Sequence, residues 1–252
     1  PQRRTVLLRE VARPIGGGAP DQHPRHLKQA HRGELHRRFG GQQPVFRILG
    51  AGPGGRADCA RAICPDEDIC VSTDDAEIIS VVEQYGLKVP FVRPEELATD
   101  TAGTYEVLLH ALDYYEKKGT HYDIVVLLQN TSPFRTTQQV KEALALYRGD
   151  VDMVVSVKEC AANPYYCVFE ENHEGYLHVC KGDGNIIRRQ DAPKAYEYNG
   201  AIYVINTQSL KHQHMHKFAK RVKYLMDDIS SFDLDSMTDW RIAEMIKKDG
   251  LK

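Results

Sequence analysis

The stretch DIVVLLQNTSPFR, residues 123–135, decides most about the fold. Ile124–Leu128 is an uninterrupted apolar run, which is typical of a parallel strand covered on both faces. An amide, two hydroxyl groups and a turn-forming proline follow directly. Because ligands of open α/β sheets bind beyond the carboxyl ends of the strands, we expect Gln129 and its neighbours to read a base or a sugar. Helix capping by Thr131 or Thr136 is an equally weighted alternative.

Strands and helices alternate on both sides of this stretch. A short strand at 69–71 ends in Ser72–Asp75, and Asp75 is placed to cap a helix that Gly86 terminates. Apolar periodicity predicts further helices at 101–118, 137–147 and 236–248, and strands at 153–157, 200–205 and 222–226. This alternation predicts an α/β fold, a Rossmann-like doubly wound sheet with helices on both faces.

Residues 164–181 interrupt the alternation. Two β-prone runs, Tyr165–Phe169 and Tyr176–Val179, flank the turn-like residues 171–175. We interpret them as an inserted β-hairpin that serves as a dimerisation arm.

Composition bounds the rest of the interpretation. The chain has 252 residues and a net charge of −2, which predicts one sizeable domain and no nucleic-acid partner. We expect no membrane partner, since the sequence has neither a long apolar run nor a signal peptide pattern. The six cysteines have spacings that match neither a zinc site nor a disulfide scaffold, and several lie in apolar runs, as Cys70 does, where we expect buried free thiols. A reducing cytoplasm fits this pattern best.

Amino-acid usage changes abruptly near residue 66. Residues 1–66 hold eleven arginines and one lysine, whereas residues 67–252 hold seven arginines and fourteen lysines. The first segment also has ten of the nineteen glycines. Three explanations stay open: a separate basic arm, a divergent half-domain, or a stretch read out of frame. We expect residues 1–45 to be poorly ordered.

Four predicted strand ends carry polar clusters: Ser72–Asp75, Gln129–Arg135, Asn206-Thr207, and Asp227 onward. In the last cluster, Asp233 and Asp235 lie two residues apart. In an extended segment both carboxylates would project to one side, where one Mg²⁺ could meet them. The alternative is that Asp235 caps the last helix while Asp233 is solvated.

Six segments together resemble the acylneuraminate cytidylyltransferase (CMP-sialic acid synthetase) family. Leu128–Arg135 resembles the family's LQPTSPLR, with Asn130 where proline is usual. The other matches are Val71–Asp75 to VSTDD, Arg93–Thr101 to RPxELAxDT, Arg188–Asp191 to RRQD, Asn199–Tyr203 to NGAIY, and Asp233–Asp235 to DxD. They occur in the family's order across 165 residues, from Val71 to Asp235.

The resemblance implies a nucleotidyltransferase that activates a nine-carbon 2-keto sugar acid with CTP, giving a CMP-sugar and pyrophosphate. It implies that Asp233 and Asp235 are the catalytic pair that holds Mg²⁺. It also implies that Arg93, Asp100 and Thr104 line the nucleotide pocket, and that Gln129, Arg189 and Tyr203 face the sugar. Residues 67–252 would be the cytidylyltransferase core of a homodimer.

One family element has no match. The family opens with a strand and a basic glycine loop, roughly ARxGSKGxPxKN, that cradles the triphosphate. Residues 12–18 come nearest, without its Ser-Lys or Lys-Asn pairs. Glu197 falls where some bacterial members carry an arginine, which leaves sialic, legionaminic and pseudaminic acids open as the sugar.

Two rival functions follow from these features. The first is a catalytically inactive homologue that still dimerises. The second is an NAD- or FAD-binding oxidoreductase, since residues 50–55 satisfy GxGxxG and Asp74 lies nineteen residues beyond Gly55. We expect the short helix before Pro65 to weigh against it. His212, His214 and His216 are expected to be solvated, not a metal site.

Overall fold

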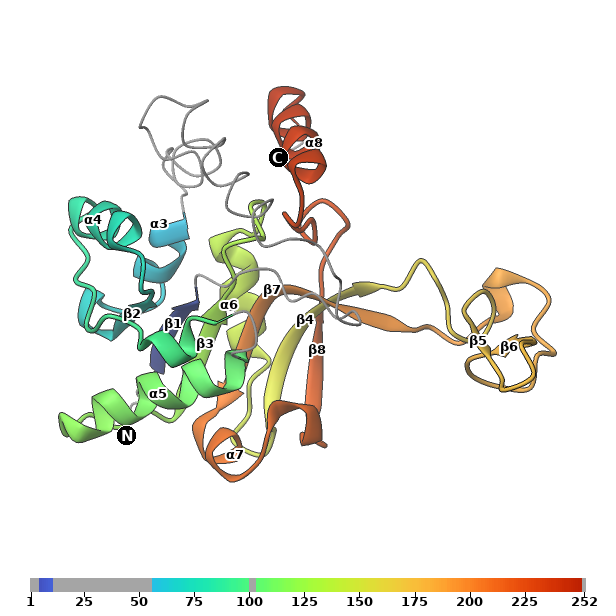
Figure 1. The fold of residues 1–252 in the computed structure, drawn as a ribbon, viewed down its shortest axis with the longest axis horizontal. Helices are drawn as coiled ribbons and strands as arrows, with labels where there is room; N and C mark the ends of the chain where they lie inside the picture. The colour runs from blue at the N-terminus through green and yellow to red at the C-terminus, as the bar shows by residue number, and fades with distance from the viewer. Residues whose placement is uncertain (1–4, 11–55, 100–102, 251–252) are drawn as a thin grey trace.

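The computed structural model describes residues 5–10, 56–99 and 103–250. In this part of the chain, the main sheet has the strand order β2-β1-β3-β7-β4-β8 (Figure 1). The strands are β1 (Thr5–Glu10), β2 (Ile69–Ser72), β3 (Ile124–Leu128), β4 (Met153–Glu159), β7 (Tyr196–Asn206) and β8 (Arg221–Leu225). β7 runs antiparallel to both of its neighbours, whereas the other pairings are parallel. The expected α/β sheet is confirmed.

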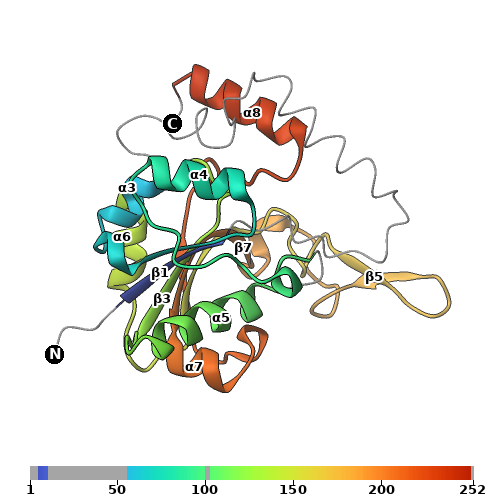
Figure 2. The same ribbon diagram turned by 60° about the vertical axis from the view of Figure 1, so that its left-hand side comes forward.

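Helices cover both faces of this sheet (Figure 2). Helices α3 (Arg56–Arg61), α4 (Ala76–Gln84) and α6 (Thr137–Ala145) lie on one face, and α5 (Thr104–Lys117) and α7 (Thr207–His212) lie on the other. β3 shows why its sequence is apolar throughout. Val126 packs into the core on the first face and Val125 into the core on the second.

Side chains fix where three helices begin. Asp75 accepts hydrogen bonds from the amides of Glu77 and Ile78, which confirms it as the cap of α4. Thr136 forms a capping box with Gln139 at α6, so the capping alternative holds for Thr136. The cap of α8 (Met237–Lys248) is Ser236, so the alternative in which Asp235 caps this helix is wrong.

Among the described residues before residue 66, Thr5–Glu10 form a strand of the main sheet. β1 pairs in parallel with both β2 and β3, so it lies inside the sheet. Val6, Leu7 and Leu8 form the β-prone run that this strand contains. The expectation of poor order over residues 1–45 stays a prediction, because the rest of that stretch lies outside the described residues. α3 is a six-residue helix, as the position of Pro65 suggested. The glycine motif at 50–55 lies outside the described residues, and the domain boundary at residue 66 stays a prediction.

The segment between β4 and β7, residues 160–195, projects from the body and is named the arm here (Figure 1). It carries the expected hairpin, formed by β5 (Phe169–Glu171) and β6 (Leu177–Val179). Its first strand is shorter than expected. The amides of Tyr166 and Cys167 donate to Asn163 O, so the chain turns there before the strand begins.

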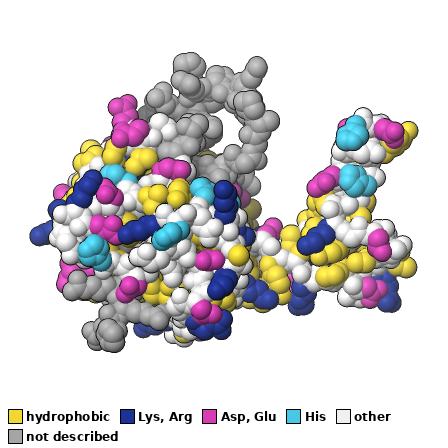
Figure 3. Space-filling view, turned by 90° about the horizontal axis from the view of Figure 1, so that it is seen from below, with side chains coloured by type: hydrophobic (Ala, Val, Ile, Leu, Met, Phe, Trp, Pro, Cys, Tyr) yellow, Lys and Arg dark blue, Asp and Glu magenta, His cyan; other side chains and the backbone are white. Residues whose placement is uncertain are grey.

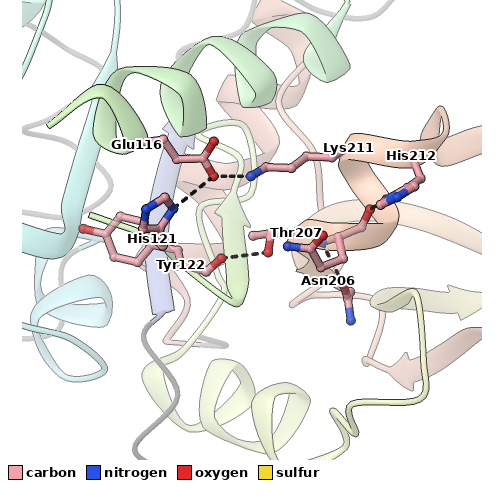
Figure 4. Close-up of polar contacts among 8 residues, drawn as sticks. Glu116, His121, Tyr122, Asn206, Thr207, Lys211 and His212 are labelled. Carbon is pink, nitrogen blue, oxygen red and sulfur yellow. Dashed lines mark hydrogen bonds and ion pairs between the residues drawn. The ribbon is translucent and has the colours of Figure 1, made fainter. Parts of the chain in front are cut away.

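The antiparallel direction of β7 overturns one expectation. Asn206-Thr207 ends β7 at the opposite edge of the sheet from the carboxyl ends of the parallel strands. There Asn206 caps α7, and Thr207 Oγ1 donates to Tyr122 O over 2.7 Å (Figure 4). Both side chains therefore serve the packing of α7 and not a ligand site. Sequence periodicity gives the position of a strand but not its direction.

Candidate active site

Three polar segments meet at one edge of the sheet. β2, β3 and β8 point in the same direction, so Ser72–Asp75, Gln129–Arg135 and the residues after β8 all leave the sheet there. One backbone hydrogen bond joins two of them, since Leu234 N donates to Thr131 O over 2.9 Å. It holds the Asp233–Asp235 segment against the loop that follows β3.

Gln129 lies over the backbone of β7. Gly200 has a φ of +72°, and a Cβ added to it would lie 2.5 Å from Gln129 Oε1. Arg135 is 6% exposed, and its guanidinium donates to Gln129 O at 3.0 Å and to Ala201 O at 2.7 Å. Arg135 and Gly200 thus bring the end of β3 and the early part of β7 together.

The other two predicted sugar residues lie elsewhere on β7 and the arm. Tyr203 pairs with Leu127 in the register of the sheet, and its ring meets that of Tyr198 edge to face at 6.3 Å. Arg189 is exposed on the arm, where its guanidinium donates to Ala161 O at 3.1 Å. The structure therefore places Gln129 directly after β3, Tyr203 on the neighbouring strand β7, and Arg189 near the base of the arm.

The predicted nucleotide residues adjoin the end of β2. Arg93 is 7% exposed, and its guanidinium donates to Ser72 Oγ at 3.1 Å and to Ser72 O. Its backbone amide donates to Thr73 O, so Arg93 fixes the VSTDD segment. Thr104 is the first residue of α5. Asp100 lies outside the described residues.

Asp233 and Asp235 are electrostatically coupled. Burial and the neighbouring carboxylates of Asp233 and Asp239 raise the pKa of Asp235. Neither aspartate forms an ion pair with a lysine or arginine of the described residues. Two such carboxylates fit the hard-cation chemistry of Mg²⁺, which usually takes its other ligands from water and substrate phosphates. Residues 59–99 and 103–250 present no larger His, Cys, Asp or Glu group for a metal.

Sequence reasoning missed the side chains that hold the Asp233–Asp235 segment in place. Ser230 Oγ accepts from Gln139 Nε2 at 2.8 Å, and its amide donates to Asp227 Oδ1 at 2.8 Å. Ser231 Oγ accepts from Asn199 Nδ2 at 2.8 Å. Asn199 belongs to the NGAIY element, but its partners are distant in the sequence, and no local pattern predicts them.

A family profile described as Cytidylyltransferase matches residues 59–247, a range that includes all three polar segments of the candidate site. The chain belongs to the cytidylyltransferase family. The expected family is therefore confirmed, and the dinucleotide-binding alternative is not favoured.

Curated cytidylyltransferases and one solved structure give the scale of the similarity. The chain is 28% identical over 190 residues to the CMP-N,N'-diacetyllegionaminic acid synthase of Legionella pneumophila, covering 71% of this chain and 78% of that protein. It is 34% identical over 185 residues to an N-acylneuraminate cytidylyltransferase of Escherichia coli, covering 72% of this chain but 42% of that protein. The solved structure of CMP:2-keto-3-deoxy-manno-octonic acid synthetase complexed with CTP matches with a TM-score of 0.57 at 14% identity, covering 98% and 100% of the two chains, which shows the shared fold.

Proposed function

We propose that this cytidylyltransferase uses CTP to activate a nonulosonic, sialic-type sugar acid, giving the CMP-sugar and pyrophosphate. The observation that carries the proposal is the hydrogen bond from Leu234 N to Thr131 O, 2.9 Å long. This bond holds the loop that carries Gln129, the proposed sugar residue, next to the proposed metal pair. The reaction requires such proximity, because the sugar hydroxyl must reach the phosphate that the metal binds. The names of the two curated relatives support the choice of substrate class.

The reaction asks for positioning and charge neutralisation from the protein. The anomeric hydroxyl oxygen of the sugar forms a bond to the α-phosphorus of CTP and loses its proton to water. The bond from that phosphorus to the bridging oxygen of the β-phosphate breaks, and pyrophosphate leaves. In this proposal Gln129 and Tyr203 orient the sugar, and the guanidinium of Arg189 pairs with its carboxylate. Arg93, Asp100 and Thr104 line the nucleotide site.

Asp233 and Asp235 would hold Mg²⁺ in this site. When bound, the ion supplies charge neutralisation for the phosphate oxygens. The two carboxylates flank Leu234, whose amide donates to Thr131 O over 2.9 Å, so both lie on the segment held against the loop after β3.

Pyrophosphate release tests the activity directly. We expect release that requires CTP, Mg²⁺ and one of three acids: sialic, legionaminic or pseudaminic acid. Asp233→Asn and Asp235→Asn should each lower kcat at least about 100-fold, because electrostatic stabilisation of this kind contributes several kcal/mol. Asp228→Asn is the matched control, since Asp228 is exposed in the same segment. Equal activity in all three variants would refute the assignment.

The named relatives do not favour the alternative of a catalytically inactive homologue, which can be tested directly because residues 1–66 do not reproduce the glycine loop of the family. β1 ends at Glu10, which marks where that loop would follow. A chimera carrying the family's loop after β1 separates the two candidates. If the chimera releases pyrophosphate and the parent chain does not, the defect lies in the loop. If neither chain releases pyrophosphate with any of the three acids, the result supports the inactive homologue.

We also propose that the arm joins two copies of the chain in a homodimer. Phe169, Leu177 and Val179 lie on one face of its hairpin, and Phe169 and Leu177 are 51% and 67% exposed. The arm stands clear of the body with apolar side chains on its surface (Figure 3). Light scattering should report a dimer that Leu177→Asp dissociates. Met245→Asp, at a residue of α8 that is 63% exposed, should leave it intact. A monomeric parent protein would refute this proposal.

A further inference from the structure

A buried polar network connects two strands, β4 and β7, to the carboxylate segment that follows β8. Ser156 on β4, Asn199 on β7 and Ser231 after β8 are 0%, 5% and 4% exposed. Ser156 Oγ donates to Asn199 Oδ1 at 2.6 Å, and Asn199 Nδ2 donates to Ser231 Oγ at 2.8 Å. Buried polar groups hold their positions firmly when all partners are present, because an unmade bond in the interior is costly.

The network lies where the β4–β7 pairing is irregular. The register shifts between Val155 and Val157, so Ser156 has no regular partner on β7. Its Oγ instead accepts from Ile202 N at 2.7 Å, and Asn199 Oδ1 also accepts from Ala201 N at 3.2 Å. The side chains of Ser156 and Asn199 thereby fix the irregular part of β7 around Gly200. Gln129 lies over this part of the strand.

At its other end the network reaches the proposed metal pair. Ser231 precedes Asp233 by two residues, and its amide donates to Asp227 O at 2.9 Å. The segment is thus attached through Ser231 Oγ to the same Asn199 that shapes the strand beside Gln129.

We propose that Ser231 is a positioning residue, which acts through Asn199 and Ser156 to hold the Asp233/Asp235 pair in register with the acceptor side of the site. The proposal rests on the proposed function and adds a physical link between its two halves. Outer partners of metal ligands typically change metal affinity about 10–100-fold when they are removed. Ser231 acts one step further out, because it fixes the backbone two residues before Asp233, so we expect an effect at the lower end of this range.

Binding of Mn²⁺ alone, followed by electron paramagnetic resonance, tests the link without relying on activity. Ser231→Ala should raise the Kd for Mn²⁺ about tenfold, and Ser231→Thr, which keeps the hydroxyl, should restore it. In pyrophosphate release, the Mg²⁺ concentration for half-maximal rate should rise similarly while the KM for CTP stays within about twofold. Hydrogen exchange at residues 227–236 should accelerate in Ser231→Ala.

Thr207→Val is the matched control. Thr207 is 0% exposed and its Oγ1 makes a 2.7 Å bond to Tyr122 O, so its loss removes a buried bond of the same kind at the opposite edge (Figure 4). Unchanged Mn²⁺ affinity in Ser231→Ala, or an equal loss in Thr207→Val, would overturn the proposal. If Ser231→Ala fails to fold, Ser231→Cys, with its weaker acceptor, takes its place in the same titration.

One further variant distinguishes this proposal from the proposed function. If Asp233→Asn binds Mn²⁺ as the parent does, the metal assignment itself fails. If Asp233→Asn loses binding but Ser231→Ala does not, the metal assignment stands and the positioning role of Ser231 fails.

Discussion

Gly200 offers the sharpest test of how the acceptor side is built. Its φ of +72° disfavours any residue with a Cβ, and in Gly200→Ala the new methyl would lie 2.5 Å from Gln129 Oε1. The backbone conformation alone should lower the free energy of unfolding by about 1–2 kcal/mol. For a chain of this size that corresponds to a Tm lower by roughly 2–8 °C.

The contact with Gln129 should add little to this loss of stability. Oε1 is the far end of a flexible side chain, so Gln129 can rotate away while the strand stays in place. Rotation removes the amide from its position beside β7, however, and we therefore expect the KM for the sugar acid to rise about tenfold, the loss of roughly one hydrogen bond. The KM for CTP should change little.

Gly119→Ala separates the two effects. Gly119 has a φ of +81°, and no atom lies within 4 Å of its hypothetical Cβ. It should show the same loss of stability in urea denaturation and thermal melts, with an unchanged KM for the sugar acid. A Gly200→Ala variant with a normal KM would refute the placement of Gln129 at the acceptor site. A stability loss far above that of Gly119→Ala would show that the strand moves instead of the side chain.

Three further predictions follow from individual contacts. Asp152 accepts hydrogen bonds from Ser209 Oγ and from the amides of Lys220 and Ala219, and these bonds lower the pKa of its carboxyl group below 3.8. The contribution of Asp152 to the free energy of unfolding is therefore complete above the unfolded pKa near 4, and it is lost as the pH falls through the folded pKa. Asp152→Asn should flatten the decline of urea stability below about pH 4, and an unaltered acid slope would contradict this. Arg135→Met should lower the free energy of unfolding by about 3 kcal/mol, because it removes the donors to Gln129 O and Ala201 O, whereas Arg148→Met at an exposed ion pair should change it by less than about 1 kcal/mol. Burial raises the pKa of the Cys70 thiol to about 12, so this thiol should not react with iodoacetamide in the native protein at pH 8. Mass spectrometry should then find the exposed Cys167 modified and Cys70 unmodified. Early modification of Cys70 would show that the core opens.

The sequence by itself predicted the family, the α/β class and most helix and strand positions. These features depend on local patterns: the apolar run of β3, the Asp75 cap, and six short motifs in order. It also predicted the inserted hairpin, because β-prone runs on both sides of a turn require no distant partner. No helix of the described residues is long and apolar enough to cross a membrane.

Only the tertiary structure decided which strand ends share an edge. The antiparallel direction of β7 moves Asn206-Thr207 away from the site and brings Asn199 and Gly200 toward it. Periodicity carries no information on strand direction, and the two apolar faces of β7 look the same in either direction. The Ser156–Asn199–Ser231 network likewise joins residues 32 to 43 positions apart, so it forms only when β4, β7 and the segment after β8 pack together.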